Sequence, residues 1–309
     1  MKVFLTGGTG AIGPATVRDL LATGHDVRVL ARTDEKAARL RAQGAEPVAV
    51  DLFDGDAVKT SVDGCDAVLH LATHVPPLRR MASKKGWAEH NRLRTTACDN
   101  LVDAALVTGA TTFVKESVSF VYPDGGDAWI DETTPPDESI EMLQPTLDGE
   151  RIVDRFTAGG GRGIVLRFGL FYGPTARGTD EALRLARWRM SMVGGKPEGY
   201  LSSVHTDDVA GAAVAALDAP AGIYNAVEEE PVTRRDYLDA FTAAFGIRKL
   251  RPMPAWLVRL TSGSAAAAVI RSWRVSNKKL HDATGWSPRY PSVREGWPAV
   301  AREREASRA

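Results

Sequence analysis

The sequence predicts an α/β fold, a Rossmann-type doubly wound parallel sheet with a smaller C-terminal substrate lobe. Two observations carry this prediction. Short apolar runs typical of buried strands alternate with helix-like segments along most of the chain, and a glycine-rich turn joins the first strand to the first helix. The chain has 309 residues, of which 44% are hydrophobic, so it is long enough for about two such parts.

The glycine-rich turn is the most informative segment. Residues 6–13 read TGGTGAIG, directly after an apolar strand at residues 3–5 and before a helix expected over residues 14–23. Glycines in this pattern permit a tight turn, close approach of a pyrophosphate and close packing of helix on sheet, while N–H groups at the helix start bind phosphate. The turn therefore predicts a bound dinucleotide, with contacts from Gly7, Thr9, Gly10, Ala11, Ile12 and Gly13.

The elements that follow keep the alternation. Residues 66–72 form a nearly continuous apolar run, as expected for a strand covered on both faces. Further strands are predicted at residues 26–30, 47–50, 112–114, 164–167 and 223–227, and helices at residues 34–43 and 87–108. Right-handed crossovers between such strands give a parallel sheet. We therefore expect an NADP-binding part over residues 1–172, with 204–230 returning to it, and a substrate-binding lobe over residues 173–203 and 231–309.

Composition narrows the classes of partner. The 39 Lys and Arg residues balance the 39 Asp and Glu residues, so neither nucleic acid nor an anionic membrane is expected as a partner. The first strand begins at about residue 2, which leaves no room for a signal peptide, and no apolar run is long enough to span a bilayer. Cys65 and Cys98 have no metal-ligand spacing, so we expect no metal and a cytoplasmic location.

The ends of the second and third strands bear on which dinucleotide binds. An acidic residue normally follows the second strand when the adenosine ribose is unphosphorylated, but this chain has Ala31 and Arg32 there. Arg32 can pair with a 2′-phosphate, which favours NADP with NAD as the runner-up; a merely solvated Arg32 is the alternative. Asp51 can accept a hydrogen bond from the adenine amino group while Leu52 packs on the ring; the alternative is that Asp51 caps the next helix.

These segments and four others resemble the short-chain dehydrogenase/reductase superfamily, in its extended, epimerase/dehydratase-like branch. The similar segments, in chain order, are residues 6–13 (TGxxGxxG), 51–52 (the adenine-contacting pair), 70–73 (HLAA), 167–174 (RxGxxYGP), 204–210 (VHVDDVA) and 224–226 (YNV). The resemblance covers nearly the whole chain. It implies cofactor contacts from Leu71, Ala72 and Thr73, places Ser119, Tyr172 and Tyr200 toward a small-molecule substrate, and allows a homodimer through two long helices.

The chain departs from that family at the catalytic pair, Tyr-x-x-x-Lys. No tyrosine of the sequence is followed by a lysine four residues later. Alignment of Glu150 with the acidic residue that follows the family's lysine puts Met142 in the Tyr place and Thr146 in the Lys place. The family's catalytic hydroxyl position falls on Val118, between Ser117 and Ser119.

Residues 115–119 (KESVS) offer polar groups in place of that pair. Glu116 is a candidate general acid or base and Ser117 a candidate hydroxyl donor, while His74 can exchange protons near neutral pH. The alternative for Glu116 is a structural ion pair with Lys115 or a nearby Arg. The alternative for His74 is a hydrogen-bonded loop histidine. Arg94 is a further unexpected charge on the long helix.

Together these features predict an NADP-dependent oxidoreductase, in particular a reductase, that acts on a small molecule with a non-standard proton donor. Two alternatives stay open. One is a catalytically degenerate, NADP-binding sensor or scaffold, which the missing Tyr-Lys pair would permit. The other is a non-redox epimerase, dehydratase or cyclase on the same fold.

Overall fold

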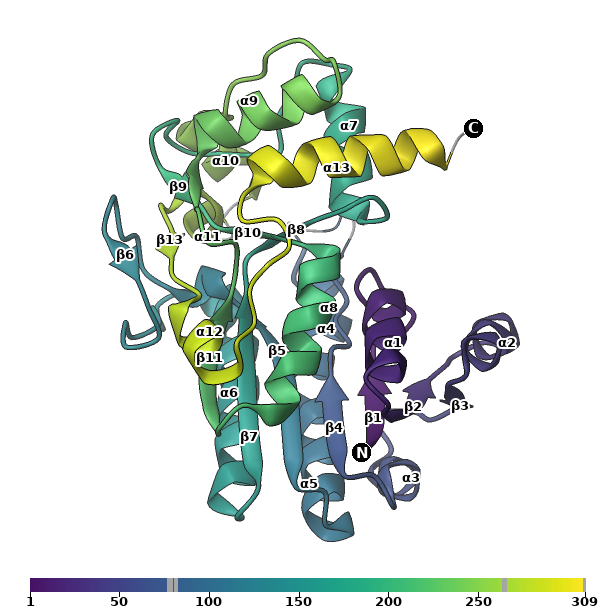
Figure 1. The fold of residues 1–309 in the computed structure, drawn as a ribbon. Coiled ribbons are helices and arrows are strands. Elements are labelled where there is room, and N and C mark those ends of the chain that lie inside the picture. Colours follow the sequence, from purple (N-terminus) through teal and green to yellow (C-terminus); the bar gives the residue numbers. More distant parts are fainter. Residues whose placement is uncertain (77–79, 81–82, 263–265, 308–309) are drawn as a thin grey trace.

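The computed structural model describes residues 1–76, 80, 83–262 and 266–307. The remaining residues of the two predicted parts, 77–79, 81–82, 263–265 and 308–309, lie outside the described residues. The fold is the predicted one. A parallel sheet is flanked by helices, and a second group of helices and short strands stands beyond the carboxyl ends of its strands (Figure 1).

Seven parallel strands form the central sheet. In spatial order they are β11 (Gly222–Ala226), β7 (Arg162–Phe168), β5 (Thr112–Val118), β4 (Ala67–His70), β1 (Lys2–Thr6), β2 (Asp26–Leu30) and β3 (Glu46–Val48). The strand order reverses at β1, because β2 and β3 lie on one side of it and the later strands lie on the other. In open α/β sheets, ligands bind beyond the carboxyl ends of the strands at such a reversal.

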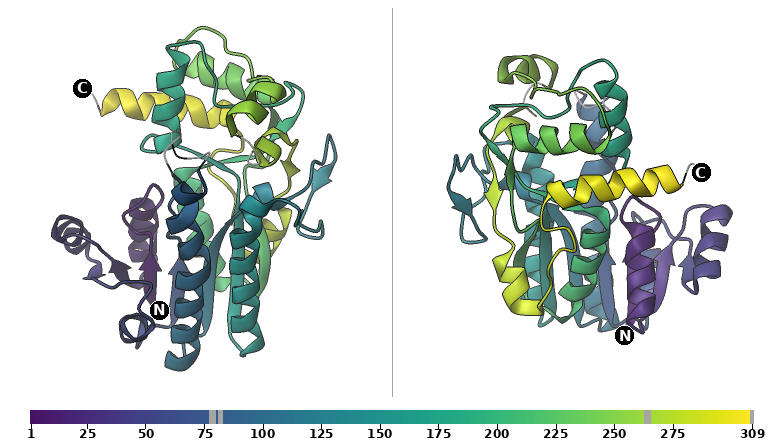
Figure 2. Two further views of the ribbon diagram at one scale, coloured as in Figure 1. Left: turned by 180° about the vertical axis from the view of Figure 1, so that it is seen from behind. Right: turned by 45° about the horizontal axis from the view of Figure 1, so that its top comes forward.

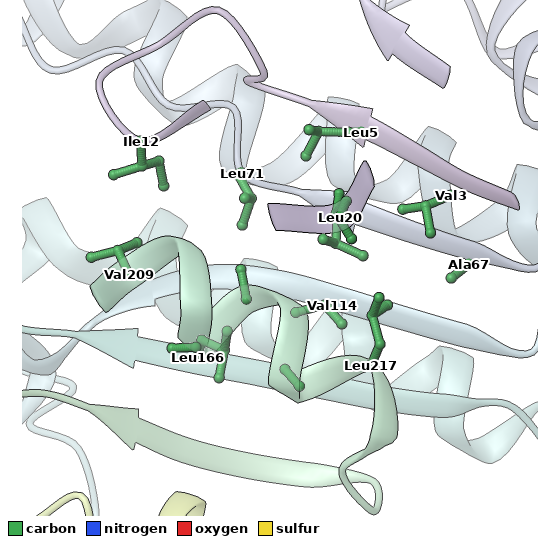
Figure 3. Close-up of a cluster of buried hydrophobic side chains, with 14 of the residues drawn as sticks. Val3, Leu5, Ile12, Leu20, Ala67, Leu71, Val114, Leu166, Val209 and Leu217 are labelled. Atoms are coloured by element: carbon green, nitrogen blue, oxygen red, sulfur yellow. The ribbon is translucent and has the colours of Figure 1, made fainter. Parts of the chain in front are cut away.

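Helices cover both faces of this sheet (Figure 2). One face carries α1 (Gly13–Ala22), α2 (Asp34–Gln43), α8 (Thr206–Ala215) and α12 (Lys278–Thr284), and the other carries α3 (Gly55–Val62), α5 (Cys98–Thr108) and α6 (Gln144–Ala158). Side chains of β1 alternate between the faces: Val3 and Leu5 pack in the first cluster, shown in Figure 3, and Phe4 packs in the second. Burial on both faces explains the continuous apolar runs.

Local signals fix the ends of the first helices. Pro14 lies in the first turn of α1, where a missing N–H leaves no hydrogen bond unmade. At the start of α2 the side chain of Thr33 accepts a hydrogen bond from the N–H of Lys36, and Gly44 ends the helix in the left-handed conformation.

A smaller lobe stands above the carboxyl ends of the strands (Figure 1). It holds α7 (Arg177–Ala186), α9 (Arg234–Ala244), α10 (Ala255–Ser262), α11 (Ala266–Ile270), α13 (Val293–Ala306) and the strand pairs β8 (Leu170–Tyr172) with β10 (Ser203–His205), β9 (Tyr200–Leu201) with β12 (Val232–Thr233), and β6 (Trp129–Ile130) with β13 (Arg274–Val275). Short 3-10 turns occur at Lys84–Trp87, Ser119–Val121, Glu141–Leu143 and Ala216–Asp218. Two segments cross the predicted division: β6 pairs with β13, and Leu280 of α12 packs on the central sheet.

Three elements differ from the prediction. The strand expected at 112–114 runs on to Val118, so the polar residues 115–117 lie inside a buried strand rather than beyond it. The strand expected at 47–50 ends at Val48, so Asp51 lies in the loop after it. The helix expected at 87–108 consists of α4 (Ala88–Arg92), a π-helical turn (Leu93–Ala97) and α5. Such π turns occur frequently at functional sites.

Candidate dinucleotide site and active site

The glycine-rich turn forms a cradle that side chains would fill. Gly7 has a φ of +84°, and the N–H of Gly10 donates to its carbonyl at 2.9 Å. A Cβ added at Gly7 would lie 2.7 Å from the carbonyl carbon of Leu71, and one at Gly13 would overlap the backbone of residues 7 and 8. The start of α1 has no side-chain cap. The shape and the uncapped N–H groups therefore suit the phosphates of a dinucleotide.

The end of β4 lies directly against this turn. His70 Nε2 is 2.9 Å from the carbonyl of Leu93, which can only accept, so Nε2 carries the proton and Nδ1 accepts from the Thr6 hydroxyl at 2.8 Å. Burial lowers the pKa of His70 to about 3 and keeps the ring neutral. Thr6 in turn accepts from the N–H of Ala72 at 3.3 Å. His70 thus fixes the residues that the resemblance places beneath the cofactor.

The predicted adenine pair follows β3. Asp51 is exposed, and its Oδ1 accepts from the N–H of Phe53 at 3.0 Å, while Leu52 is buried. The carbonyl of Leu52 accepts from Asn100 Nδ2 at 2.9 Å, which holds this loop against α5. The cap of α3 is Asp54, so the alternative role of Asp51 as a helix cap does not apply.

Arg32 is exposed just beyond β2. Its Nη1 lies 3.3 Å from Oε1 of Glu89 on α4, and the other oxygen of Glu89 lies 3.8 Å from Nδ1 of His74. An exposed ion pair of this kind is worth about 0–1 kcal/mol, so a phosphate can displace Glu89 from Arg32. The structure thus groups His74 with Arg32 and Glu89, away from Glu116, which pairs with Arg94, and from Ser117, which bonds to Glu150.

Glu116 is buried in an ion pair with Arg94 of the π-helical turn. Arg94 Nη2 lies 3.1 Å from Oε1 and 3.0 Å from Oε2, and both side chains are almost fully buried. Lys115 has its Nζ 3.0 Å from the carbonyl of Glu116, and burial lowers the pKa of this lysine. The arrangement is the structural ion pair that stood as the alternative for Glu116; it does not present the carboxylate to an open surface.

Ser117 belongs to a second buried cluster. Its hydroxyl donates to Oε1 of Glu150 on α6 at 2.5 Å, and Arg167 of β7 binds both oxygens of Glu150 at 3.0 and 2.6 Å. The guanidinium of Arg167 also lies 4.9 Å from the ring centroid of Tyr122, whose hydroxyl donates to Asn225 at 2.9 Å. This cluster was not predicted from the sequence. Its signals were present, because Arg167 is the first residue of the family-like segment 167–174, and Glu150 aligns with the acidic residue that follows the family's lysine.

Three buried polar atoms near these strand ends have no hydrogen-bond partner among the described residues. They are Oγ of Ser119, Nη1 of Arg167 and Nδ2 of Asn225. Arg167 and Asn225 are register neighbours on β7 and β11, so their side chains lie on the same face. Unpaired buried donors are rare in proteins. Among the described residues, this end of the sheet therefore has hydrogen-bonding capacity that its own side chains do not use.

The two tyrosines expected at the substrate lie in different surroundings. Tyr172 is only 1% exposed, and its hydroxyl donates to the buried carboxylate of Glu228. Tyr200 lines a groove of about 350 Å³, where Arg274 is stacked between its ring and that of Trp129. Met142 and Thr146 are the residues that the alignment places in the family's Tyr and Lys positions. Met142 packs in a small apolar cluster with Ile140, and Thr146 is buried in α6.

The described part of the chain lacks the features of a membrane span and of a clustered metal site. It contains no helix long and apolar enough to cross a membrane. It also contains no group of three or more His, Cys, Asp or Glu side chains arranged to hold a metal ion.

Residues 3–226 match the model of the NAD dependent epimerase/dehydratase family. A 3-diazoavenalumate denitrifying reductase from a Streptomyces species is 31% identical to the chain, over 96% of this chain and 99% of that protein. A 4-hydroxy-2-methyl-3-oxo-4-farnesyl-3,4-dihydroquinoline-1-oxide ketoreductase from Stigmatella aurantiaca is 28% identical, over 80% of this chain and 74% of that protein.

Solved structures share the fold. Human epimerase family protein SDR39U1 with NADPH has a TM-score of 0.79 at 22% identity, and the match covers 98% of this chain and 99% of that one. MoeE5 in complex with UDP-glucose and NAD has a TM-score of 0.80 at 22% identity, with both chains fully covered. The comparisons confirm the predicted fold class and an NAD(P)-dependent enzyme of the oxidoreductase type. The chain belongs to the NAD dependent epimerase/dehydratase family.

Proposed function

We propose that the protein is an NADP-dependent reductase of a small, electron-poor molecule. The observation that carries the proposal is the glycine cradle of residues 7–13 together with Arg32 beyond β2, where an NAD-specific site would have an acidic residue. NADPH supplies a hydride when bound. The names of two relatives, a denitrifying reductase and a ketoreductase, support reduction as the reaction.

The surroundings of the acidic and hydroxyl groups favour a substrate that needs little help from a protein acid. Glu116 is committed to Arg94, and Ser117 is committed to Glu150. Met142 has no titratable group at the position that the resemblance gives to the catalytic Tyr. A strongly electrophilic acceptor, such as an enone, an imine or a diazo compound, takes up hydride without a strong proton donor. We therefore place the substrate in this chemical class.

The test of this function is direct. The purified protein is incubated with NADPH deuterated at the transferable position and with a panel that contains an enone, a ketone, an imine and an aromatic diazo compound. We expect loss of NADPH absorbance with one class and deuterium in its product. Tight NADPH binding without turnover of any of them would favour the sensor or scaffold. Isomerisation without net loss of NADPH would favour the non-redox alternative.

Arg32→Ala is expected to raise the Kd of NADPH about 10- to 100-fold, because a charge-assisted pair with the 2′-phosphate contributes about 1.5–3 kcal/mol. The Kd of NADH is expected to stay nearly the same. Titration of both dinucleotides by nucleotide fluorescence measures the two effects. Arg39→Ala is the matched control, because Arg39 is another exposed arginine paired with a glutamate. Equal weakening of NADPH and NADH would show that Arg32 does not read the 2′-phosphate.

A further inference from the structure

A chain of contacts leads from β5 to the loop after β4. It begins with the buried Glu116–Arg94 ion pair. Nε of Arg94 then lies 2.8 Å from Nε2 of His90, a buried residue of α4. Nδ1 of His90 lies 3.3 Å from the hydroxyl oxygen of Thr73, which is exposed. Four residues from four segments are thus joined from the core to the surface.

The contacts determine which nitrogen of His90 carries its proton. A guanidinium has only N–H donors and no acceptor, so Arg94 must donate to Nε2, which must be unprotonated. Burial and the charge of Arg94 lower the pKa of His90 to about 3, which leaves the ring neutral. A neutral imidazole has one N–H. In His90 that N–H is therefore on Nδ1.

This tautomer decides what the Thr73 hydroxyl can do. Because Nδ1 of His90 carries the proton, which the backbone of His74 and the Thr73 oxygen both can accept, Nδ1 cannot accept from the Thr73 hydroxyl, whose hydrogen must point elsewhere. Thr73 is exposed at the carboxyl end of β4, in the segment whose preceding residues Leu71 and Ala72 pack against Gly7. The free hydrogen is therefore available beside the glycine cradle.

We propose that the Thr73 hydroxyl donates a hydrogen bond to an oxygen of the dinucleotide, and that Glu116, Arg94 and His90 are positioning residues that keep it a donor. The proposal rests on the proposed NADP site. In this proposal Glu116 holds Arg94 in place and does not exchange protons, a role that suits a buried, ion-paired carboxylate. Glu116 orients Arg94, Arg94 fixes the tautomer of His90, and His90 in that tautomer cannot accept the hydroxyl hydrogen of Thr73.

The spectroscopic test examines His90 in the intact protein. In protein labelled with ¹⁵N at histidine, long-range proton–nitrogen correlation distinguishes the two tautomers, and His90→Gln assigns the signal. We expect the Nδ1–H form, unchanged between about pH 5 and about pH 8. An Nε2–H form, or titration of this ring within that range, would overturn the proposed positioning.

The binding test uses NADPH alone, without a substrate. Thr73→Val is expected to raise the Kd of NADPH about tenfold, while Thr73→Ser keeps the hydroxyl and the affinity. His90→Leu is expected to weaken binding similarly and, combined with Thr73→Val, to add little further. His90→Gln retains one acceptor for Arg94 and one donor for Thr73, so it should bind normally.

Thr108→Val is the control, because the Thr108 hydroxyl donates to the carbonyl of Ala104 within α5, at the end of the helix far from the loop after β4 in sequence. An unchanged Kd in Thr73→Val, or the same loss in Thr73→Ser, would overturn the role of Thr73. These readouts do not depend on turnover. Absence of reduction with the binding and tautomer results intact would overturn the proposed reaction alone.

Discussion

Arg94→Met is expected to lower the free energy of unfolding by about 3–5 kcal/mol, the largest effect that we expect from a single substitution in this chain. The change removes the guanidinium and leaves Glu116 buried without its counter-charge. A carboxylate in that position is costly because it has lost its hydration, and Lys115 beside it directs its ammonium group at the Glu116 carbonyl rather than forming an ion pair with the carboxylate. Urea-induced unfolding, followed by circular dichroism, measures the loss.

Two further variants make this result interpretable. Arg155→Met removes an exposed arginine that pairs with Asp99 and Asp103, so it should cost less than about 1 kcal/mol. The double variant Arg94→Met with Glu116→Met replaces both charges with apolar side chains and should recover much of the loss. A loss in Arg94→Met no larger than that in Arg155→Met would contradict the buried ion pair.

Glu228 is expected to stabilise the folded protein less as the pH rises from about 4.5 to about 8, whereas the buried His70 and His90, whose pKa values are lowered to about 3, act in the opposite direction up to about pH 6.5. Burial raises the pKa of this carboxyl from 4.5 to about 8 in the folded state. Over that range the unfolded chain releases the proton while the folded protein keeps it, so rising pH favours unfolding; above the folded pKa the effect is complete. The contribution is on the order of 5 kcal/mol, and the difference in urea unfolding between the wild-type protein and a Glu228 variant across the range measures it.

Glu228→Gln is the appropriate comparison, since an amide cannot ionise but can still accept from Tyr172. The stability of the wild-type protein relative to the variant should fall as the pH rises, because the contributions of His70 and His90 are common to both. Asp208 contributes in the same direction, because burial raises the pKa of its carboxyl to about 6, so the difference between the two proteins isolates Glu228. Parallel pH profiles would show that folding does not raise the pKa of Glu228.

The parts of this fold that follow from the sequence are those with local causes. The glycine turn, the helix at residues 34–43 and the buried strand runs each depend on residues close together in the chain. The end of β5 could not be predicted in that way. Glu116 and Ser117 are tolerated inside a buried strand only because Arg94 and Glu150, from other elements, satisfy them.

The candidate site shows the same limit. Asp51 and Leu52 follow β3 as the family pattern indicates. The residue that caps α3 is Asp54, and not Asp51. The surroundings of Tyr172 and Tyr200 could not be predicted, because they depend on how the smaller lobe packs. Tyr172 meets Glu228 beneath α13, where a Cβ at Gly296 would overlap its hydroxyl.

The π-helical turn at Leu93–Ala97 has a consequence for how this region can vary. A π turn accommodates one more residue than an α turn, so the face presented by α4 is rotated relative to that of α5. Leu101 and Ala105 of α5 stay fixed on the sheet, while His90 of α4 faces the loop after β4. Exposed residues of α4 can therefore vary without altering the face of α5 that packs on the sheet, whereas His90 cannot vary in this way, because Arg94 joins it to the buried Glu116.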